Sequence, residues 1–177
     1  STVTTLAGRS VALVSDGKYW VAGHRATVPE YLPGFARFNS NGSLDTTFGT
    51  AGLVNFAIGT DSTFSRFLNA LSTGKVLLGA TSFNGLSLDI VLARFNTNGT
   101  FDTSFATTGI VTLSGNVSSE EVLFSQLISS NGYYAGCRAR TGGGAANAVI
   151  YRVQTNGTLD TAFNTTGVLQ KNYSAVS

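Results

Sequence analysis

The sequence predicts an all-β protein made of three repeats, each with about four antiparallel strands. One segment occurs three times, as "FNSNGSLDTTFGTAGLV" at 38–54, "FNTNGTFDTSFATTGIV" at 95–111 and "VQTNGTLDTAFNTTGVL" at 153–169. The chain contains 21 glycines and many Asn, Ser and Thr residues between apolar runs, a composition typical of strands joined by tight turns. Helical periodicity is weak, so the repeat sets the fold class.

The repeat recurs about every 57 residues and fills the chain as a single domain. We place the three copies at approximately 5–60, 61–117 and 118–177. Weak helical patterns occur at 62–71 and 120–128, but their phase within the repeat favours strands at both places. The prediction is therefore about twelve strands with no helix.

Each strand of the first copy is bounded by a turn signal. "RSVALVSDGKYWVAGHRA" at 9–26 reads as two strands around Asp16-Gly17, and "GFARFNSNGSLDTTF" at 34–48 reads as a strand that enters a turn at Asn41-Gly42. "GLVNFAI" at 52–58 supplies the fourth strand. Asp-Gly and Asn-Gly between apolar runs predict hairpins, because both central residues of a type I′ turn need positive φ. The later copies place Asn98-Gly99, Asn156-Gly157, Thr73-Gly74 and Asn131-Gly132 at the matching turns.

Three residue types recur at fixed spacing and are assigned structural roles. An arginine lies within an apolar strand, an aspartate follows eight residues later, and a phenylalanine follows the aspartate. A buried arginine must be paired, so we expect each to bind an aspartate of its own or a neighbouring repeat. The aspartate suits an Asx-turn, and the phenylalanine anchors the bend in apolar packing. These residues are Arg37, Asp45 and Phe48; Arg94, Asp102 and Phe105; and Arg152, Asp160 and Phe163.

At these residues the sequence resembles the delta-sixty repeat of bacterial proteins. The first copy matches almost every position of that pattern, from Asp16-Gly17-Lys18 through Arg37-Phe38 to Asp45, Phe48 and Gly52. The second copy departs at Thr73 and Ala106, and the third departs at Tyr133, taken to replace the lysine, and at Val153 and Asn164. The resemblance covers nearly the whole chain. It implies β-propeller blades and no particular activity.

The number of copies leaves the architecture open. Propellers normally close with about four to eight blades, so three blades form an open arc. Exposed strand edges invite pairing with another chain, and two chains can close a ring of six. The β-prone ends, at 1–6 and 167–177, could then complete a partner's blade. A β-trefoil and an open filament are the alternatives.

Composition favours some functional classes over others. The net charge is +2 without any run of Lys or Arg, so no surface for nucleic acid is predicted. No stretch reaches the length of a membrane helix. The chain lacks Met and is poor in charged residues, which we interpret as an extracellular or cell-surface protein, and the resemblance to the delta-sixty repeat implies a bacterial source. Cys137 is the single cysteine, and we expect it to be buried and inert.

No catalytic, metal or cofactor site is predicted. His24 is the one histidine, and no nucleophile motif surrounds any serine. Asn39, Asn41 and Asp45 form an oxygen-rich loop, but one carboxylate in each loop is too little for a calcium site. The sequons at the hairpin asparagines are explained by the turns themselves.

Divergence between the copies locates a candidate ligand site. After the second strand of each copy come His24-Arg25, Thr81-Ser82, and Arg138 with Arg140. His24, Arg25, Arg138 and Arg140 are the candidate residues for a basic rim suited to an acidic glycan or carboxylate, although we favour the simpler interpretation of ordinary strand packing with solvated charges. The leading functional prediction is a non-enzymatic structural module that assembles with itself. A lectin-like module that uses the divergent loops is the alternative.

Overall fold

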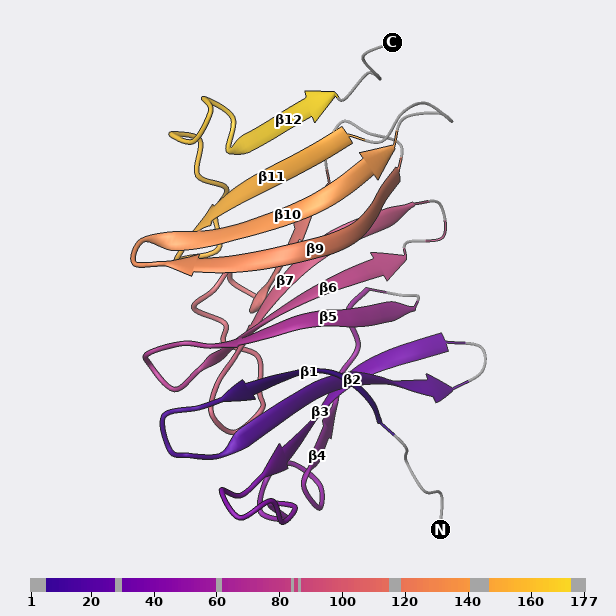
Figure 1. The fold of residues 1–177 in the computed structure, drawn as a ribbon, viewed down its shortest axis with the longest axis vertical. Helices are drawn as coiled ribbons and strands as arrows, with labels where there is room; N and C mark the ends of the chain where they lie inside the picture. Colours follow the sequence, from indigo (N-terminus) through magenta and orange to yellow (C-terminus); the bar gives the residue numbers. More distant parts are fainter. Residues whose placement is uncertain are drawn as a thin grey trace.

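The computed structural model consists of three four-stranded antiparallel sheets (Figure 1). It describes residues 6–27, 30–59, 62–83, 85, 87–114, 119–140 and 147–172. Each sheet is built from four strands that follow one another in the chain, and we call the sheets blades 1, 2 and 3. The strands are β1 (Ala7–Leu13), β2 (Tyr19–Thr27), β3 (Glu30–Phe38), β4 (Leu53–Asn55), β5 (Thr63–Ala70), β6 (Val76–Phe83), β7 (Leu88–Phe95), β8 (Ile110–Leu113), β9 (Ser119–Ser129), β10 (Gly132–Arg140), β11 (Asn147–Gln154) and β12 (Val168–Asn172).

The blades stack along the long axis of the molecule, with blade 2 in the middle (Figure 1). β1, β2 and β3 contact β5, while β9 contacts β5, β6 and β7. One apolar core lies between blades 1 and 2 and is centred on Trp20, Phe35 and Phe95. A second core lies between blades 2 and 3 and is centred on Leu92 and Tyr151. Blade 2 therefore buries both of its faces.

The two outer blades each bury a single face. Strand β11 alternates strictly between buried and more exposed residues, whereas six consecutive residues of β7 in blade 2 are buried. Because successive side chains of a strand point to opposite faces, one face of blade 3 packs on blade 2 and the other is open. Blade 1 is open on its far side in the same way, where Val11 and Leu13 are exposed.

The hairpin turns differ from the predicted type. Gly17, Gly42 and Gly99 have positive φ, but the residues before them do not. The amide of Gly42 donates to the carbonyl of Asn39, and the amide of Asn39 donates to Ser43. These are type I turns that close with a glycine in the left-handed conformation, so the expectation of positive φ at both central residues was wrong. The glycine is required, while the asparagine is used for its side chain.

The third copy turns one residue earlier than its sequence alignment suggests. Gly132 does not have positive φ and pairs within β10, opposite Gln154. Tyr133 pairs with Val153, as Val76 pairs with Phe95 and Tyr19 with Phe38. Gly132 therefore occupies the lysine position of the first two copies, and Tyr133 continues the strand. The prediction that Tyr133 replaces the lysine was wrong, because a shorter loop shifted the register by one residue.

The fold class agrees with the sequence prediction. The chain is all-β, and both segments with a weak helical pattern are strands, β5 and β9. Three separate four-stranded sheets fit propeller-like blades and not the β-trefoil. The described part of the chain has no helix of the length and hydrophobicity needed to cross a bilayer.

Candidate functional site: the arginine–aspartate network between blades

Blade 1 holds a compact ion-pair network where β3 enters its turn. The Oδ2 atom of Asp45 accepts from Arg37 Nε and from Lys18 Nζ, each at 2.7 Å. The Oδ1 atom accepts from the amide of Thr47 at 3.2 Å and from its hydroxyl at 2.6 Å, which is the predicted Asx-turn. The guanidinium of Arg37 also lies 4.4 Å above the ring of Phe48. All the lone pairs of the buried carboxylate are thereby used.

Blade 2 repeats the network and buries it more deeply. Asp102 Oδ2 accepts from Arg94 Nε at 2.6 Å and from Lys75 Nζ at 2.7 Å. Its Oδ1 accepts from the hydroxyl of Ser104 at 2.7 Å, and Arg94 stacks 4.8 Å from the ring of Phe105. Each arginine thus binds the aspartate of its own repeat, the first of the two pairings that the sequence left open.

Blade 3 carries a reduced network. Asp160 forms an ion pair with Arg152 NH1 at 3.0 Å, and no lysine is present because Gly132 stands at that position. The residue two after the aspartate is Ala162, so the amide hydrogen bond is kept and the hydroxyl hydrogen bond is lost. The Nε atom of Arg152 is buried without a hydrogen-bond partner. The third copy is therefore the least satisfied of the three.

The networks keep the two better-paired carboxyls ionised. The hydrogen bond from Lys18, with those from Thr47 and Arg37, holds the pKa of Asp45 well below its ordinary value. Burial raises the pKa of Asp102, but hydrogen bonds from Lys75, Ser104 and Arg94 outweigh it and hold that pKa well below its ordinary value too. These carboxylates act as permanent negative charges that orient the basic side chains.

The arginines of the first two networks also connect one blade to the next. Arg37 NH1 donates to the carbonyl of Thr97 at 2.8 Å, and Arg94 NH1 donates to the carbonyl of Thr155 at 2.6 Å. Both acceptors lie in the Asn-Gly turn of the following repeat. The same turn presses its glycine against the preceding blade, since a Cβ on Gly99 would lie 2.9 Å from the Phe48 ring. The networks of blades 1 and 2 therefore each bind the turn of the next blade.

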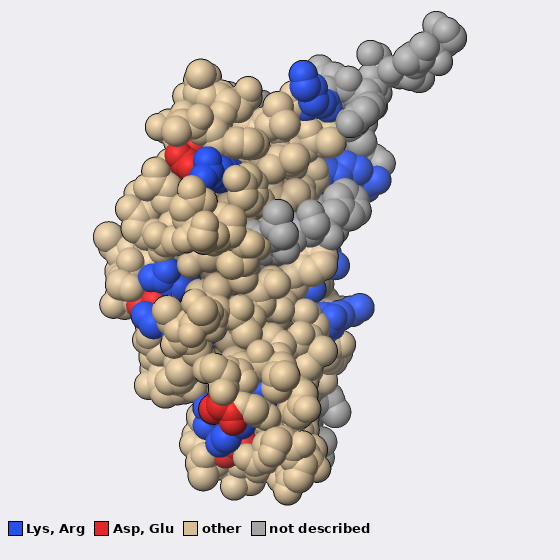
Figure 2. All heavy atoms as spheres, turned by 60° about the vertical axis from the view of Figure 1, so that its left-hand side comes forward, with Lys and Arg blue, Asp and Glu red and all other residues tan. Residues whose placement is uncertain are grey.

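The three networks form a column along one side of the molecule. Figure 2 shows three groups of acidic and basic atoms above one another on a surface that otherwise carries little charge. Along the other side, basic residues follow one another without this pattern (Figure 2). The column marks the side on which the Asn-Gly turns join the blades.

A cleft of about 340 Å³ opens beside the network of blade 2. It is lined by Ser72, Lys75, Arg94, Tyr133 and Thr155, and the Tyr133 hydroxyl lies 3.4 Å from Arg94 NH1. The matching crevice between blades 1 and 2 holds about 50 Å³. The larger volume coincides with the shorter β9–β10 loop. The cleft presents cationic groups and hydroxyls, which are suited to a small carboxylate or a sugar.

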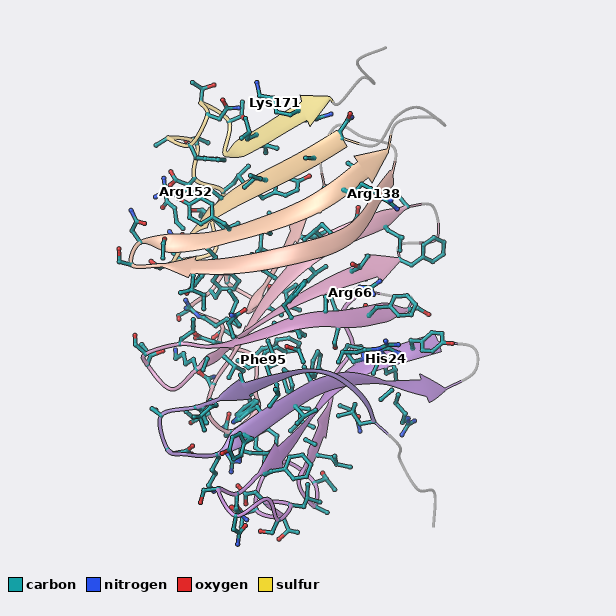
Figure 3. All side chains as sticks on the ribbon, viewed as in Figure 1. His24, Arg66, Phe95, Arg138, Arg152 and Lys171 are labelled. Carbon is teal, nitrogen blue, oxygen red and sulfur yellow. The ribbon has the colours of Figure 1, made fainter. Side chains whose placement is uncertain are left out.

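The fold places the four candidate residues of the basic rim on two different blades. His24 and Arg138 occupy equivalent positions, because they pair with Pro33 and Ala148 at the same distance from the arginines of their blades. They belong to blades 1 and 3, with Arg66 of blade 2 at a level between them (Figure 3). His24 points toward blade 2, while Arg138 follows the buried Cys137 and points to the open face of blade 3. Arg25 faces away from His24, and the side chain of Arg140 lies outside the described part.

His24 is buried in an aromatic environment. Its ring makes edge contacts with Tyr31 and Phe64 at centroid distances of 5.3 Å and 5.7 Å, and its Nδ1 atom has no hydrogen-bond partner. Burial, with the charges of Arg9 and Arg66, lowers the pKa of His24. A neutral histidine packed between blades is a structural residue in this position. Among the described residues, no group of three His, Cys, Asp or Glu side chains lies close enough to bind a metal ion.

One family model matches the chain. Residues 15–48 and 71–105 match the model of a β-propeller domain of unknown function (DUF5122). The two segments run from the first turn to the network phenylalanine of blades 1 and 2, so the match covers the ion-pair motif itself. It agrees with the propeller blades that the delta-sixty resemblance implied, although under a different family name. No curated protein matches the chain.

The carbonyl acceptors of the network could not have been read from the sequence. Thr97 and Thr155 bind arginine through backbone oxygens, for which any residue type would serve. The cleft at Tyr133 was also missed, because it follows from a loop shortened by one residue. The departures of the third copy from the repeat were the one available signal for it.

Proposed function

We propose that the protein is a non-enzymatic structural module that assembles with copies of itself. The supporting observation is the contrast between the middle blade and the outer blades. Blade 2 has apolar side chains buried on both faces, whereas blades 1 and 3 expose Val11 and Ile150 at the positions of the buried Leu68 and Leu92 of blade 2. Exposed apolar side chains gathered on a sheet face are typical of interaction surfaces. The low charge of the chain supports a secreted or surface-bound location.

Light scattering over a wide range of protein concentration tests this proposal. The expected result is a mass that exceeds the 18.4 kDa of one chain and rises with concentration toward a fixed or growing assembly. Association by burial of apolar surface is retained at high salt, because salt screens charges and not apolar contacts. A constant monomer mass at every concentration would contradict the proposal.

A second candidate function, the binding of a sugar acid, is favoured by the cleft between blades 2 and 3. Its cationic groups and hydroxyls come from Lys75, Arg94, Tyr133 and Ser72. Titration calorimetry with glucuronate and galacturonate as probes measures the binding directly. Ser72 is exposed at the cleft, so Ser72→Tyr should fill the cavity and abolish the heat without unfolding the protein. Wild-type protein that gives no heat with either probe would exclude this function for these ligands.

A further inference from the structure

The outer blades have complementary faces, and this inference rests on the self-assembly proposed above. We propose that blade 3 of one copy binds blade 1 of a second copy, head to tail, through the contacts that already join consecutive blades within the chain. The internal junctions, between blades 1 and 2 and between blades 2 and 3, provide the template. The face of blade 1 away from blade 2 is called the head, and the face of blade 3 away from blade 2 is called the tail.

The tail exposes the side chains that the preceding blades bury under their neighbour. Ile150 is 37% exposed, whereas Phe35 and Leu92, at the same strand position in blades 1 and 2, are both fully buried. Phe163 is partly exposed, whereas Phe48 and Phe105 are buried. Tyr134 packs edge-on against Phe163 at a centroid distance of 5.9 Å and continues this apolar surface. The tail thus has the chemistry of a blade-binding face without a blade on it.

The head exposes the side chains with which a blade packs on its predecessor. Val11 and Leu13 are 62% and 58% exposed. Leu68 is the blade 2 equivalent of Val11, since each lies six residues before the turn glycine of its blade. Leu68 is 5% exposed and packs in the core against blade 1. Tyr19 is likewise exposed where Val76 of blade 2 is buried. The head therefore has the same kind of apolar side chains as the face with which blade 2 packs on blade 1.

The Asn-Gly turn of blade 1 is the contact left unused. A Cβ on Gly99 would lie 2.8 Å from Val54, and one on Gly157 would lie 2.6 Å from the Ala106 amide, because these turns press against the preceding blade. A Cβ on Gly42 would have nothing within 4 Å. The Asn-Gly turns of blades 2 and 3 are thus packed against the preceding blade, whereas the turn of blade 1 is open. The tail of a second copy supplies the missing surface.

Arg152, the network arginine of the tail, has donors that can bind that turn. In blades 1 and 2, the Nε atom of the arginine binds its aspartate and NH1 binds the carbonyl of the next turn. In blade 3, NH1 of Arg152 binds Asp160 instead, and the buried Nε has no partner. The carbonyl of Ser40 in a docked head is the equivalent of Thr97 and Thr155. Docking lets Arg152 donate Nε to Asp160 and NH1 to the Ser40 carbonyl, so the buried Nε gains the partner that it lacks in the single chain.

Substitution of Gly42 tests the turn contact. Asparagine tolerates positive φ, so Gly42→Asn fits the open turn of the monomer but places side-chain atoms where docking leaves no room. The expected result is a fall in the association constant of about tenfold or more. Gly17→Asn is the matched control, since Gly17 also has positive φ and open space and its blade 2 equivalent, Gly74, makes contacts no closer than 3.4 Å. It should associate as the wild type does.

Mixing two variants tests the head-to-tail arrangement. Gly42→Asn blocks the head and leaves the tail intact, while Ile150→Glu places a charge on the tail and leaves the head intact. Each variant should be monomeric by light scattering at concentrations at which the wild type assembles, and an equimolar mixture should there give a dimer that grows no further. Circular dichroism and thermal melts confirm that both variants are folded.

Each result separates this inference from the proposed function. A wild-type protein that stays monomeric overturns both. A wild-type assembly that neither variant weakens keeps self-assembly and overturns the head-to-tail contact. Two monomeric variants that fail to pair on mixing also overturn it, because complementary intact faces would then not suffice. A capped dimer in the mixture, with assembly retained in the Gly17→Asn control, is the result that we expect.

Discussion

Replacing Asp102 with asparagine removes the charge around which the network of blade 2 is built. The Asp102 side chain is 6% exposed and that of Arg94 is 10% exposed, so this pair is shielded from solvent. Loss of one partner from a buried pair costs about 3–5 kcal/mol. The amide keeps the size of the side chain and an acceptor for Ser104, so we expect the low end, about 3 kcal/mol. Lys75 is more exposed and adds about 0.5 kcal/mol.

The assay is a thermal melt of Asp102→Asn beside the matched variant Asp160→Asn. A free-energy loss of about 3 kcal/mol lowers Tm by about 6–12 °C in a protein of this size. Asp160 has a single cation at 3.0 Å, and that cation, Arg152, is 18% exposed. Its loss should cost about 1–2 kcal/mol, between the values for exposed and buried pairs. The reasoning predicts that the loss for Asp102→Asn is about 1.5 to 3 times the loss for Asp160→Asn.

The pH dependence gives an independent check of the same reasoning. Because the folded pKa of Asp102 is depressed, its stabilising effect is complete above the unfolded pKa of about 3.9 and is lost as pH falls through the folded pKa. The gap in Tm between wild type and Asp102→Asn should therefore close at low pH. Equal losses for the two variants, or a gap that does not narrow in acid, would refute the account.

Two further predictions concern the residues between blades. His24→Phe should flatten the rise in stability with pH, because the lowered pKa of His24 means that the unfolded state binds more protons than the folded state between the folded pKa and 6.5. Urea unfolding at pH values on both sides of 6.5 measures this, and an unchanged dependence of the unfolding free energy on pH would contradict it. Phe105→Ala should cost about 3–5 kcal/mol because the ring is fully buried between blades 2 and 3. Phe163→Ala should cost less than half of that in the monomer, and a loss of equal size would show that Phe163 is not at an open face.

Much of the fold could be predicted because the repeat is determined by interactions between residues close to one another in the sequence. The aspartate binds the residue two positions later, and the asparagine of each turn accepts from the residue two positions later, as Asn41 does from Ser43. Interactions over such short distances in sequence need no knowledge of the rest of the fold. The Arg37–Asp45 pairing was predictable for the same reason, because eight residues bring the two side chains together across one turn.

The candidate sites were harder to predict because they depend on neighbouring blades. His24, Arg25, Arg138 and Arg140 appear equivalent in sequence, but a repeat places equivalent residues on different blades and so keeps them apart. The cleft beside Tyr133 depends on the β9–β10 loop, which is one residue shorter than the matching loops. The sequence did not reveal this, because Asn131-Gly132 looked like the turn of the other copies. Backbone acceptors such as the Thr155 carbonyl carry no sequence signal.

The sequence by itself determined the strand content, the threefold repeat, the glycine turns and the pairing of each arginine with an aspartate. These depend on local conformational preference and on contacts between residues close in the chain. The tertiary structure decided which copies are covered and which are open, because burial depends on what stands next to a blade. Three nearly identical motifs therefore have different surroundings. The networks of blades 1 and 2 each bind the turn of the following blade. In blade 3, NH1 of Arg152 binds Asp160 and the buried Nε has no partner, since no fourth blade among the described residues supplies a turn carbonyl for NH1.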